Sequence, residues 1–134
     1  MQSILRISDA AAIALHAADY LARQEKPVSS TADIADALRV SHNHLSKVLQ
    51  RLTKAGLLRP ERGPRGGFAL SASGRTAKVR DFISAIDGPP VIGECLLKHK
   101  VCGASGCAFG SFIRETNVRY EKVLNSRISA IRRN

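Results

Sequence analysis

The stretch from Ser41 to Gly56 constrains the fold more than any other part of the chain. Serine favours the position just before a helix, and glycine favours the left-handed residue just after one. Between them, apolar residues recur at positions i, i+3, i+4 and i+7, namely Leu45, Val48, Leu49 and Leu52. This spacing is typical of a helix with one face against a core. The sequence therefore predicts a helix with one buried and one polar face.

Two earlier segments predict helices that pack beside this one. The first runs from Asp9 to Arg23, with Ser8 as its N-cap, and its apolar residues include Ile13, Ala17 and Leu21. The second runs from Ala32 to Leu38 and begins at Ser30 or Thr31. A three-residue turn, 39–41, separates it from the third helix. This order is typical of a helix-turn-helix unit.

The residues after the third helix predict a β-hairpin. Its strands are Leu57–Arg59 and Gly67–Leu70, and the sequence PERGPRG between them is rich in residues that form turns. The Gly66–Gly67 pair permits a sharp turn and a close approach of the backbone to a phosphate. We therefore expect a mainly α fold with a small β-hairpin, and a winged helix-turn-helix domain over residues 1–75.

Positive charge is concentrated on this predicted domain. The chain has 134 residues and a net charge of +10, and the segment 39–65 carries seven basic residues and one acidic residue. Such a charge favours a polyanionic partner, either nucleic acid or an anionic membrane surface. Amides and cations share the outer face of the third helix, a mixture that suits reading of base edges and phosphates, whereas a merely solvated surface would not require it.

We therefore expect the chain to bind double-stranded DNA through two groups of residues. The group on the third helix consists of Ser41, Asn43, His44, Lys47, Gln50 and Arg51. The group on the hairpin consists of Arg62, Arg65 and Gly66.

Two further helices are predicted after the hairpin. One runs from Thr76 to Ile86 and is stopped by Asp87, Gly88 and two prolines. The other runs from Ser111 to about Arg132 with a stripe of coiled-coil type, made of Ile113, Tyr120, Leu124, Ile128 and Ile131 with Phe112 and Val123 alongside. A helix of this length spans about 30 Å and favours pairing with a second copy, although packing on its own domain is the alternative. We expect residues 76–110 to link the two parts and residues 111–134 to form a dimerisation helix.

All three cysteines of the chain, Cys95, Cys102 and Cys107, lie in one loop between these helices. Three thiols on one loop can converge on a soft metal centre, with a fourth ligand from elsewhere. Zinc bound with His99 is a competing interpretation, although no CxxC pair is present. Unligated thiols that act as a reversible redox pair are another.

Other classes of protein are disfavoured by what the sequence lacks. No apolar run approaches the roughly 20 residues needed to cross a bilayer, and no signal peptide is evident, so we expect a cytoplasmic protein without a membrane partner. The chain shows no nucleophile–base constellation, no phosphate-binding glycine loop and no paired carboxylates. We therefore expect neither an enzyme nor a small-molecule substrate.

Four features together give the chain a resemblance to a known family. These are SHNHLSKVLQRLTKAGLL (Ser41–Leu58), RGPRGGFAL (Arg62–Leu70), AIDG (Ala85–Gly88) and the three cysteines. The chain resembles the Rrf-two family of bacterial winged-helix regulators, which includes an iron–sulfur cluster regulator and a nitric-oxide-sensitive repressor. The resemblance implies a homodimeric transcription factor, with repression as the expected mode, on a palindromic operator. It also implies that the three cysteines ligate an iron–sulfur cluster, 2Fe-2S or 4Fe-4S, whose state controls DNA affinity.

The chain departs from the family pattern at the fourth ligand. Relatives of the iron–sulfur cluster regulator have a histidine three residues after the third cysteine, where this chain has Gly110. Nitric-oxide-sensing relatives use an acidic residue from the partner chain near the start of the first helix, and Asp9 aligns with it. Asp9 could equally stabilise the helix dipole. His99, Glu94 and an exogenous thiol or water remain open as ligands.

Two alternative functions stay open at the level of sequence. One is a cluster-free winged-helix regulator that uses its cysteines as a thiol redox switch or a zinc site. The other is a metal-binding or redox-active adaptor that docks a protein partner.

Overall fold

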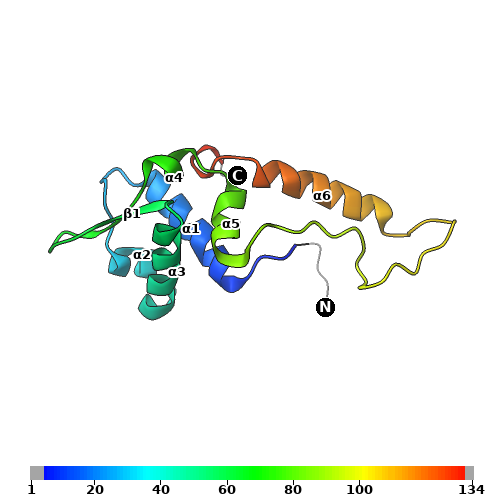
Figure 1. The fold of residues 1–134 in the computed structure, drawn as a ribbon, viewed down its shortest axis with the longest axis horizontal. Coiled ribbons are helices and arrows are strands. Elements are labelled where there is room, and N and C mark those ends of the chain that lie inside the picture. Colours follow the sequence, from blue (N-terminus) through cyan, green and yellow to red (C-terminus); the bar gives the residue numbers. More distant parts are fainter. Residues whose placement is uncertain (1–4, 132–134) are drawn as a thin grey trace.

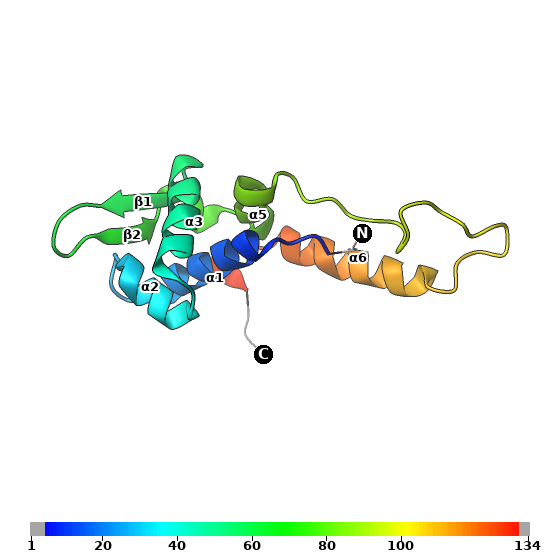
Figure 2. The same cartoon turned by 90° about the horizontal axis from the view of Figure 1, so that it is seen from below.

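The structure is a computed structural model that describes residues 5–131, and it is elongated (Figure 1). A helical body carries a β-hairpin at one end, and at the other end a long loop and α6 project from it (Figure 2). The helices are α1 Asp9–Arg23, α2 Thr31–Leu38, α3 His42–Lys54, α4 Ala72–Thr76, α5 Val79–Asp87 and α6 Gly110–Leu124, with a 3-10 turn η1 Ile128–Ala130. The strands are β1 Leu58–Glu61 and β2 Gly67–Leu70. The predicted fold class is confirmed.

Serine side chains begin the first three helices, as predicted. The hydroxyl oxygens of Ser8, Ser30 and Ser41 accept hydrogen bonds from backbone N–H groups three residues later, at 3.0 to 3.1 Å. Helix α3 ends as the sequence indicated, because Gly56 has φ +82° and lies just after its last turn. Helix α2 ends in the same way at Arg39, which adopts φ +55° without being glycine.

The core is built around α1, which contacts α2, α3, α5 and η1. Four of its alanines, Ala11, Ala14, Ala17 and Ala18, have no solvent exposure. These small side chains let the neighbouring helices approach α1 closely. The large side chains that fill the core therefore come from those helices, and they include Phe82, Leu45 and Leu49. This packing fixes α3 with its polar face outward.

The hairpin is anchored to the body by a third extended segment. Strands β1 and β2 pair antiparallel, with Leu58 opposite Leu70, so the predicted first strand starts one residue later and runs two residues further. Ser29 exchanges backbone hydrogen bonds with Phe68, at 3.0 and 2.8 Å. Next to that bridge, a Cβ atom on Gly67 would lie 2.1 Å from the carbonyl oxygen of Ser29. Only glycine allows the hairpin to lie so close.

The predicted single helix from Thr76 to Ile86 is wrong at its start, because the structure has two helices there. Helix α4 begins earlier, at Ala72, and is capped by Ser71. The hydroxyl oxygen of Ser71 accepts from the N–H of Gly74 at 2.9 Å, and its hydroxyl donates to the carbonyl oxygen of Gly56 at 2.5 Å. A new cap then starts α5, where the Asp81 carboxylate accepts from the N–H of Lys78 at 2.8 Å. Serine and glycine at positions 71–74 favour a loop in isolation, and the bond from Ser71 to Gly56 joins residues 15 positions apart, which a local pattern does not indicate.

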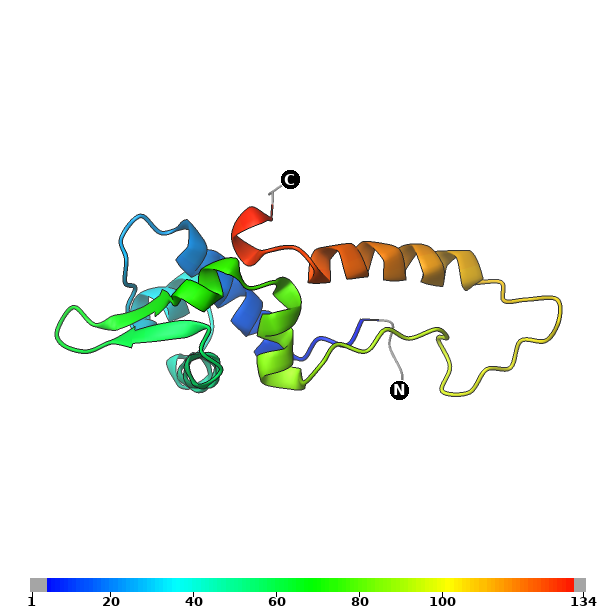
Figure 3. The ribbon, with the colours of Figure 1, turned by 45° about the horizontal axis from the view of Figure 1, so that its top comes forward.

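The last helix is also shorter than predicted. Helix α6 ends at Leu124, and the chain then turns back onto the body, where the N–H of Val79 donates to the carbonyl oxygen of Ser126 at 2.9 Å (Figure 3). The predicted end near Arg132 lies outside the described residues. Three members of the expected coiled-coil stripe are buried in the core of this same chain: Tyr120, Leu124 and Ile128. Burial raises the pKa of the Tyr120 phenol, and the negative charge of Asp87 adds to this effect.

Candidate nucleic-acid interface and cysteine pocket

The polar face of α3 is exposed along its length. All the predicted DNA-contacting residues on this helix are solvent-exposed: Ser41, Asn43, His44, Lys47, Gln50 and Arg51. The four apolar residues of the predicted stripe are at most 2 % exposed. The face is therefore presented to solvent by a rigidly packed helix, which is the arrangement that insertion into a groove requires.

Arg51 differs from the rest of this group because it also holds the body together. Its guanidinium Nη2 donates to the carbonyl oxygen of Ile86 at 2.6 Å, near the C-terminal end of α5. A cation at this end of a helix is favoured by the helix dipole. Arg51 therefore ties α3 to α5, a role that the sequence pattern did not indicate.

The hairpin tip carries the other predicted contacts. Arg62 and Arg65 are exposed, and neither forms an ion pair with another residue in the described range 5–131. Arg59, by contrast, is paired with Glu61 at 2.6 Å. Gly66 is needed for the tip itself, since a Cβ atom there would lie 2.4 Å from the carbonyl oxygen of Glu61. Two unpaired guanidinium groups thus extend from a tightly folded turn.

The three cysteines line one pocket, with a volume of about 570 Å³, between the long loop and α6. The loop also contributes Glu94 and Lys100, and α6 contributes Gly110, Ile113, Arg114, Asn117 and Val118. All three cysteines are free of disulfide bonds; Cys102 and Cys107 are exposed and Cys95 is half-buried. The structure therefore brings the predicted sulfur ligands to one site.

Within that pocket, Cys102 and Cys107 are neighbours. A hydrogen bond with Cys107, together with the charge of that residue, raises the pKa of the Cys102 thiol. The sulfur of Cys107 accepts from the N–H of Phe109, and the sulfur of Cys95 accepts from the N–H of Leu97, both at 3.4 Å. The sulfurs of Cys95 and Cys107 are thus each positioned by the local backbone.

The donor chemistry of the pocket fits an iron–sulfur cluster, because three thiols of one loop line it and thiolates are the ligands that such clusters take. Thiolates also bind zinc. Among the described residues, no group of three or more histidine, cysteine, aspartate or glutamate side chains is placed to hold one metal ion. His99 is exposed and does not line the pocket.

The other residues considered as ligands lie in different settings. Glu94 is at the pocket but is paired with Lys100 at 2.8 Å, and this hydrogen bond and charge lower the pKa of the Glu94 carboxyl. Asp9 is exposed in the first turn of α1 and does not line the pocket of its own chain. Gly110 lies in the wall, where a Cβ atom would be 3.7 Å from the Cβ of Cys107.

Asn117 is a pocket residue that the sequence analysis missed. Its Nδ2 group donates to the carbonyl oxygen of Gly93 at 2.8 Å, while its Oδ1 atom is buried without a hydrogen-bond partner in the described structure. An asparagine on the polar part of a helical pattern gives no signal of such a position. Only the fold of the loop onto α6 reveals it.

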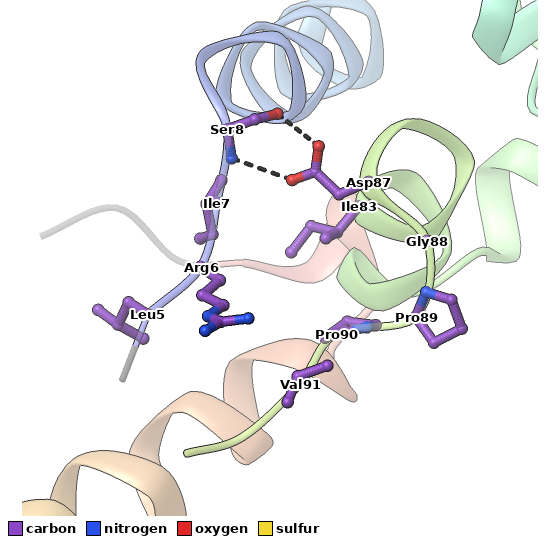
Figure 4. Close-up of a pocket in the computed structure, with 10 residues that line it drawn as sticks. All are labelled: Leu5, Arg6, Ile7, Ser8, Ile83, Asp87, Gly88, Pro89, Pro90 and Val91. Carbon is purple, nitrogen blue, oxygen red and sulfur yellow. Dashed lines mark hydrogen bonds between the residues drawn. The ribbon is translucent and has the colours of Figure 1, made fainter. Parts of the chain in front are cut away.

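A second junction joins the start of α1 to the end of α5. The N–H of Ser8 donates to Asp87 Oδ2 at 3.0 Å, and the hydroxyl of Ser8 donates to Asp87 Oδ1 at 2.5 Å. Figure 4 shows these two bonds beside a pocket of about 430 Å³ lined by residues 5–8, Ile83 and residues 87–91. Asp87, which the sequence indicated only as a helix stop, therefore fixes the point where the chain leaves for the cysteine loop.

Comparisons with known proteins agree with this geometry. The family described as Rrf2, iron-dependent transcriptional regulator, matches residues 7–128. The HTH-type transcriptional regulator IscR of Vibrio campbellii is 30% identical over 85% of this chain and 64% of its own length. IscR of Pectobacterium carotovorum is 32% identical, over 85% of this chain and 65% of its own length. The chain thus spans just under two thirds of the length of these curated relatives.

Solved structures show the same fold. IscR of T. potens is similar with a TM-score of 0.61 and 28% identity, over 90% of this chain and 80% of that one. CymR, the global cysteine regulator of B. subtilis, is similar with a TM-score of 0.67 and 23% identity, over 90% and 89% of the two chains. In residues 5–131, no helix is both long and apolar enough to cross a membrane.

Proposed function

This chain belongs to the Rrf2 family of transcriptional regulators, and from this premise we propose that it represses transcription by binding a palindromic operator under the control of an iron–sulfur cluster. The proposal that the chain binds DNA rests on one observation. The exposed amides and cations of α3 lie on the same body as a hairpin with two unpaired arginines. The cluster part is supported by the three cysteines that line one pocket.

On DNA, α3 would lie in a major groove with the hairpin beside it. Asn43 and Gln50 carry amides that can pair with adenine edges, and Lys47 carries a cation for a phosphate or guanine. Arg62 and Arg65 would reach the backbone or a narrow minor groove. Such binding releases counterions, so affinity should fall steeply as salt rises.

We propose that two copies pair through α6. After burial of Tyr120 and Leu124 in its own core, α6 still exposes Phe112 and Val123 on one side, with exposed fractions of 57% and 48%. Val123 also borders an apolar groove of about 400 Å³ that runs between α6, α5 and the segment before α1. Covering these side chains with a second α6 would remove them from water and set the spacing of two half-sites.

Cys95, Cys102 and Cys107 would hold the cluster. When bound, the cluster supplies a redox-active centre that reacts with small oxidants or nitric oxide. Asp9 of the partner subunit is one candidate for the fourth ligand, taken from the resemblance to nitric-oxide-sensing relatives. The loop leaves the body at Asp87, one residue after the carbonyl that Arg51 of α3 holds. Loss or damage of the cluster would move this loop and thereby the orientation of α3.

A thiol switch is the second candidate, because Cys102 and Cys107 are hydrogen-bonded neighbours. Here hydrogen peroxide would oxidise one thiolate to a sulfenic acid, with the other oxygen leaving as water. Attack by the second thiol would then form the disulfide and release a second water. Two thiols lose two electrons, which the peroxide gains.

One experiment separates these functions. The protein is purified without oxygen, its iron and sulfide are measured, and its binding to a labelled promoter fragment is titrated before and after exposure to nitric oxide or air. We expect a brown protein whose DNA affinity changes with the cluster, and Cys102→Ala should bleach it. Colourless, iron-free protein with a peroxide-dependent DNA affinity would support the thiol switch instead. Failure to retain any promoter fragment would contradict the regulatory proposal.

A further inference from the structure

The three cysteines of the pocket come from two limbs of the long loop. Cys102 and Cys107 flank the turn 103–106, which a backbone hydrogen bond of 3.0 Å closes, and α6 begins soon afterwards. Cys95 lies on the outgoing limb, residues 88–101, which runs beside α6 in the opposite direction (Figure 2). The first two thiols therefore stay together through the turn, whereas Cys95 joins them only when the outgoing limb lies against α6.

Asn117 makes the one hydrogen bond that joins the outgoing limb to α6 within residues 5–131. Its Nδ2 group donates to the carbonyl oxygen of Gly93 at 2.8 Å, in a half-buried setting. The other hydrogen bonds of the limb stay within the loop or, at Gly88, continue α5. The buried Ile113 also lines the pocket, but apolar contact has no preferred direction. The amide of Asn117 is therefore what fixes where along α6 the limb lies.

This hydrogen bond shortens the free chain that precedes Cys95. Gly93, whose carbonyl oxygen is held, lies two residues before Cys95, a span of about 7 Å when extended. Without the bond, the nearest preceding residue that is hydrogen-bonded to a helix is Gly88, seven residues before Cys95, a span of about 25 Å. Losing one side-chain contact would thus greatly enlarge the volume that the Cys95 thiol can sample.

We propose that Asn117 is a positioning residue: by holding Gly93 on α6, it keeps Cys95 beside the other two cysteines, so that three sulfurs converge on one centre. The identity of that centre rests on the proposed cluster function, but the position of Cys95 can be measured in the cluster-free chain. Asn117 acts through the backbone of Gly93 and is not itself a ligand. Removing its hydrogen bond should therefore displace Cys95 and leave the Cys102–Cys107 pair intact.

The hydrogen-bond donor of Asn117 can be removed with little change in size. Asn117→Asp places a carboxylate oxygen against the carbonyl oxygen of Gly93, and Asn117→Ala removes the donor without adding a charge. Asn125→Asp is the matched control on the same helix, because its oxygen can still accept from Arg80, as the amide oxygen of Asn125 does at 3.2 Å.

Cross-linking of the cluster-free chain measures the position of Cys95 directly. The reduced full chain and its variants are treated without oxygen with a short bis-maleimide, and the linked cysteine pairs are identified by mass spectrometry. In both Asn117 variants, links from Cys95 to either of the other cysteines should fall about tenfold, because a longer free chain lowers its effective concentration. The link between Cys102 and Cys107 should be unchanged, and the Asn125→Asp protein should match the unmodified one.

The cluster-loaded proteins, purified without oxygen, provide the second measurement. Both Asn117 variants should lose iron to a ferrous chelator about tenfold faster than the unmodified protein, because one of three thiolates is no longer held in place. Their visible absorption should change towards that of a Cys95→Ala protein. Asn125→Asp should retain iron and absorption unchanged.

Other outcomes would contradict the inference. Unchanged linking of Cys95 in both Asn117 variants would show that another contact positions this cysteine, and an equal loss of all three links would indicate general loosening of the loop. Weakened linking with unchanged iron loss would show that the centre does not need the tether. If the unmodified protein lacked iron and sulfide but its Cys95 links still depended on Asn117, the cluster function would fall and the positioning role would stand.

Discussion

Arg51 in α3 and Ile86 near the end of α5 are joined by a hydrogen bond of 2.6 Å from the guanidinium to the backbone carbonyl oxygen. The bond links the proposed DNA-reading helix to the helix from which the cysteine loop departs. Ser8 and Asp87 make the adjoining link to α1. Three helices thus converge on the place where the loop begins.

Arg51 and Lys47 should therefore respond differently to removal of their charge. Arg51→Met keeps an apolar stem but loses the bond to Ile86, which should lower the free energy of unfolding by about 1–2 kcal/mol in urea denaturation. Lys47→Met, which loses only an exposed cation, should leave unfolding within about 0.5 kcal/mol. It should instead weaken DNA binding and reduce the salt-dependence slope by about 1 in a titration at several salt concentrations. Equal unfolding midpoints for the two variants would contradict the structural role of Arg51.

The thiol of Cys102 should become more reactive when Cys107 is removed. Cys107 raises the pKa of Cys102, so less of that thiol is ionised at a given pH. Replacing Cys107 with alanine removes the largest cause, which lowers the pKa and increases the thiolate fraction. In cluster-free protein near pH 8, alkylation of Cys102 by iodoacetamide, followed by mass spectrometry, should be faster in Cys107→Ala than in the unmodified chain. A slower reaction would contradict the sign of this coupling.

Placing a histidine at position 110 should strengthen metal binding. A Cβ atom there lies 3.7 Å from the Cβ of Cys107, so an imidazole would project beside that sulfur. The nearest obstacle, 3.1 Å away, is the far end of the flexible Arg114 side chain. Gly110→His should slow iron loss to a chelator in protein purified without oxygen. Iron loss as fast as in the unmodified chain would show that the imidazole does not reach the iron.

Adding a single methyl group at Gly67, where the hairpin contacts the body, should destabilise the protein. Gly67→Ala would force a Cβ atom to 2.1 Å from the Ser29 carbonyl oxygen, so we expect a loss of about 3 kcal/mol in the free energy of unfolding. Gly103→Ala meets no atom within 4 Å and should change the unfolding midpoint little. Thermal and urea denaturation of both variants test this contrast. Retained stability in Gly67→Ala would mean that the hairpin can move away from the body.

Short-range patterns predicted most of the N-terminal body. The N-caps at Ser8, Ser30 and Ser41 and the stripe on α3 depend on residues a few positions apart, and the structure confirms them. The sequence also predicted which three sulfurs share a site, because one short loop confines them.

Long-range partners escaped prediction. Asp87 meets a residue 79 positions earlier, and Asn117 meets a carbonyl group 24 positions earlier. The apolar stripe of the last helix was correct in periodicity, but a periodicity does not say which surface covers it. Tyr120 and Leu124 are covered by their own chain, while pairing through the exposed side chains of α6 stays a prediction.

Because the chain returns to the body at Ser126, the segment 88–125 is attached at both of its ends to one short helix, α5. It departs from the last residue of α5 and comes back to hydrogen-bond with Val79, the first residue of that helix. A change in the span of this segment would therefore act on both ends of α5, because one end of the segment continues that helix and the other is hydrogen-bonded to its first residue.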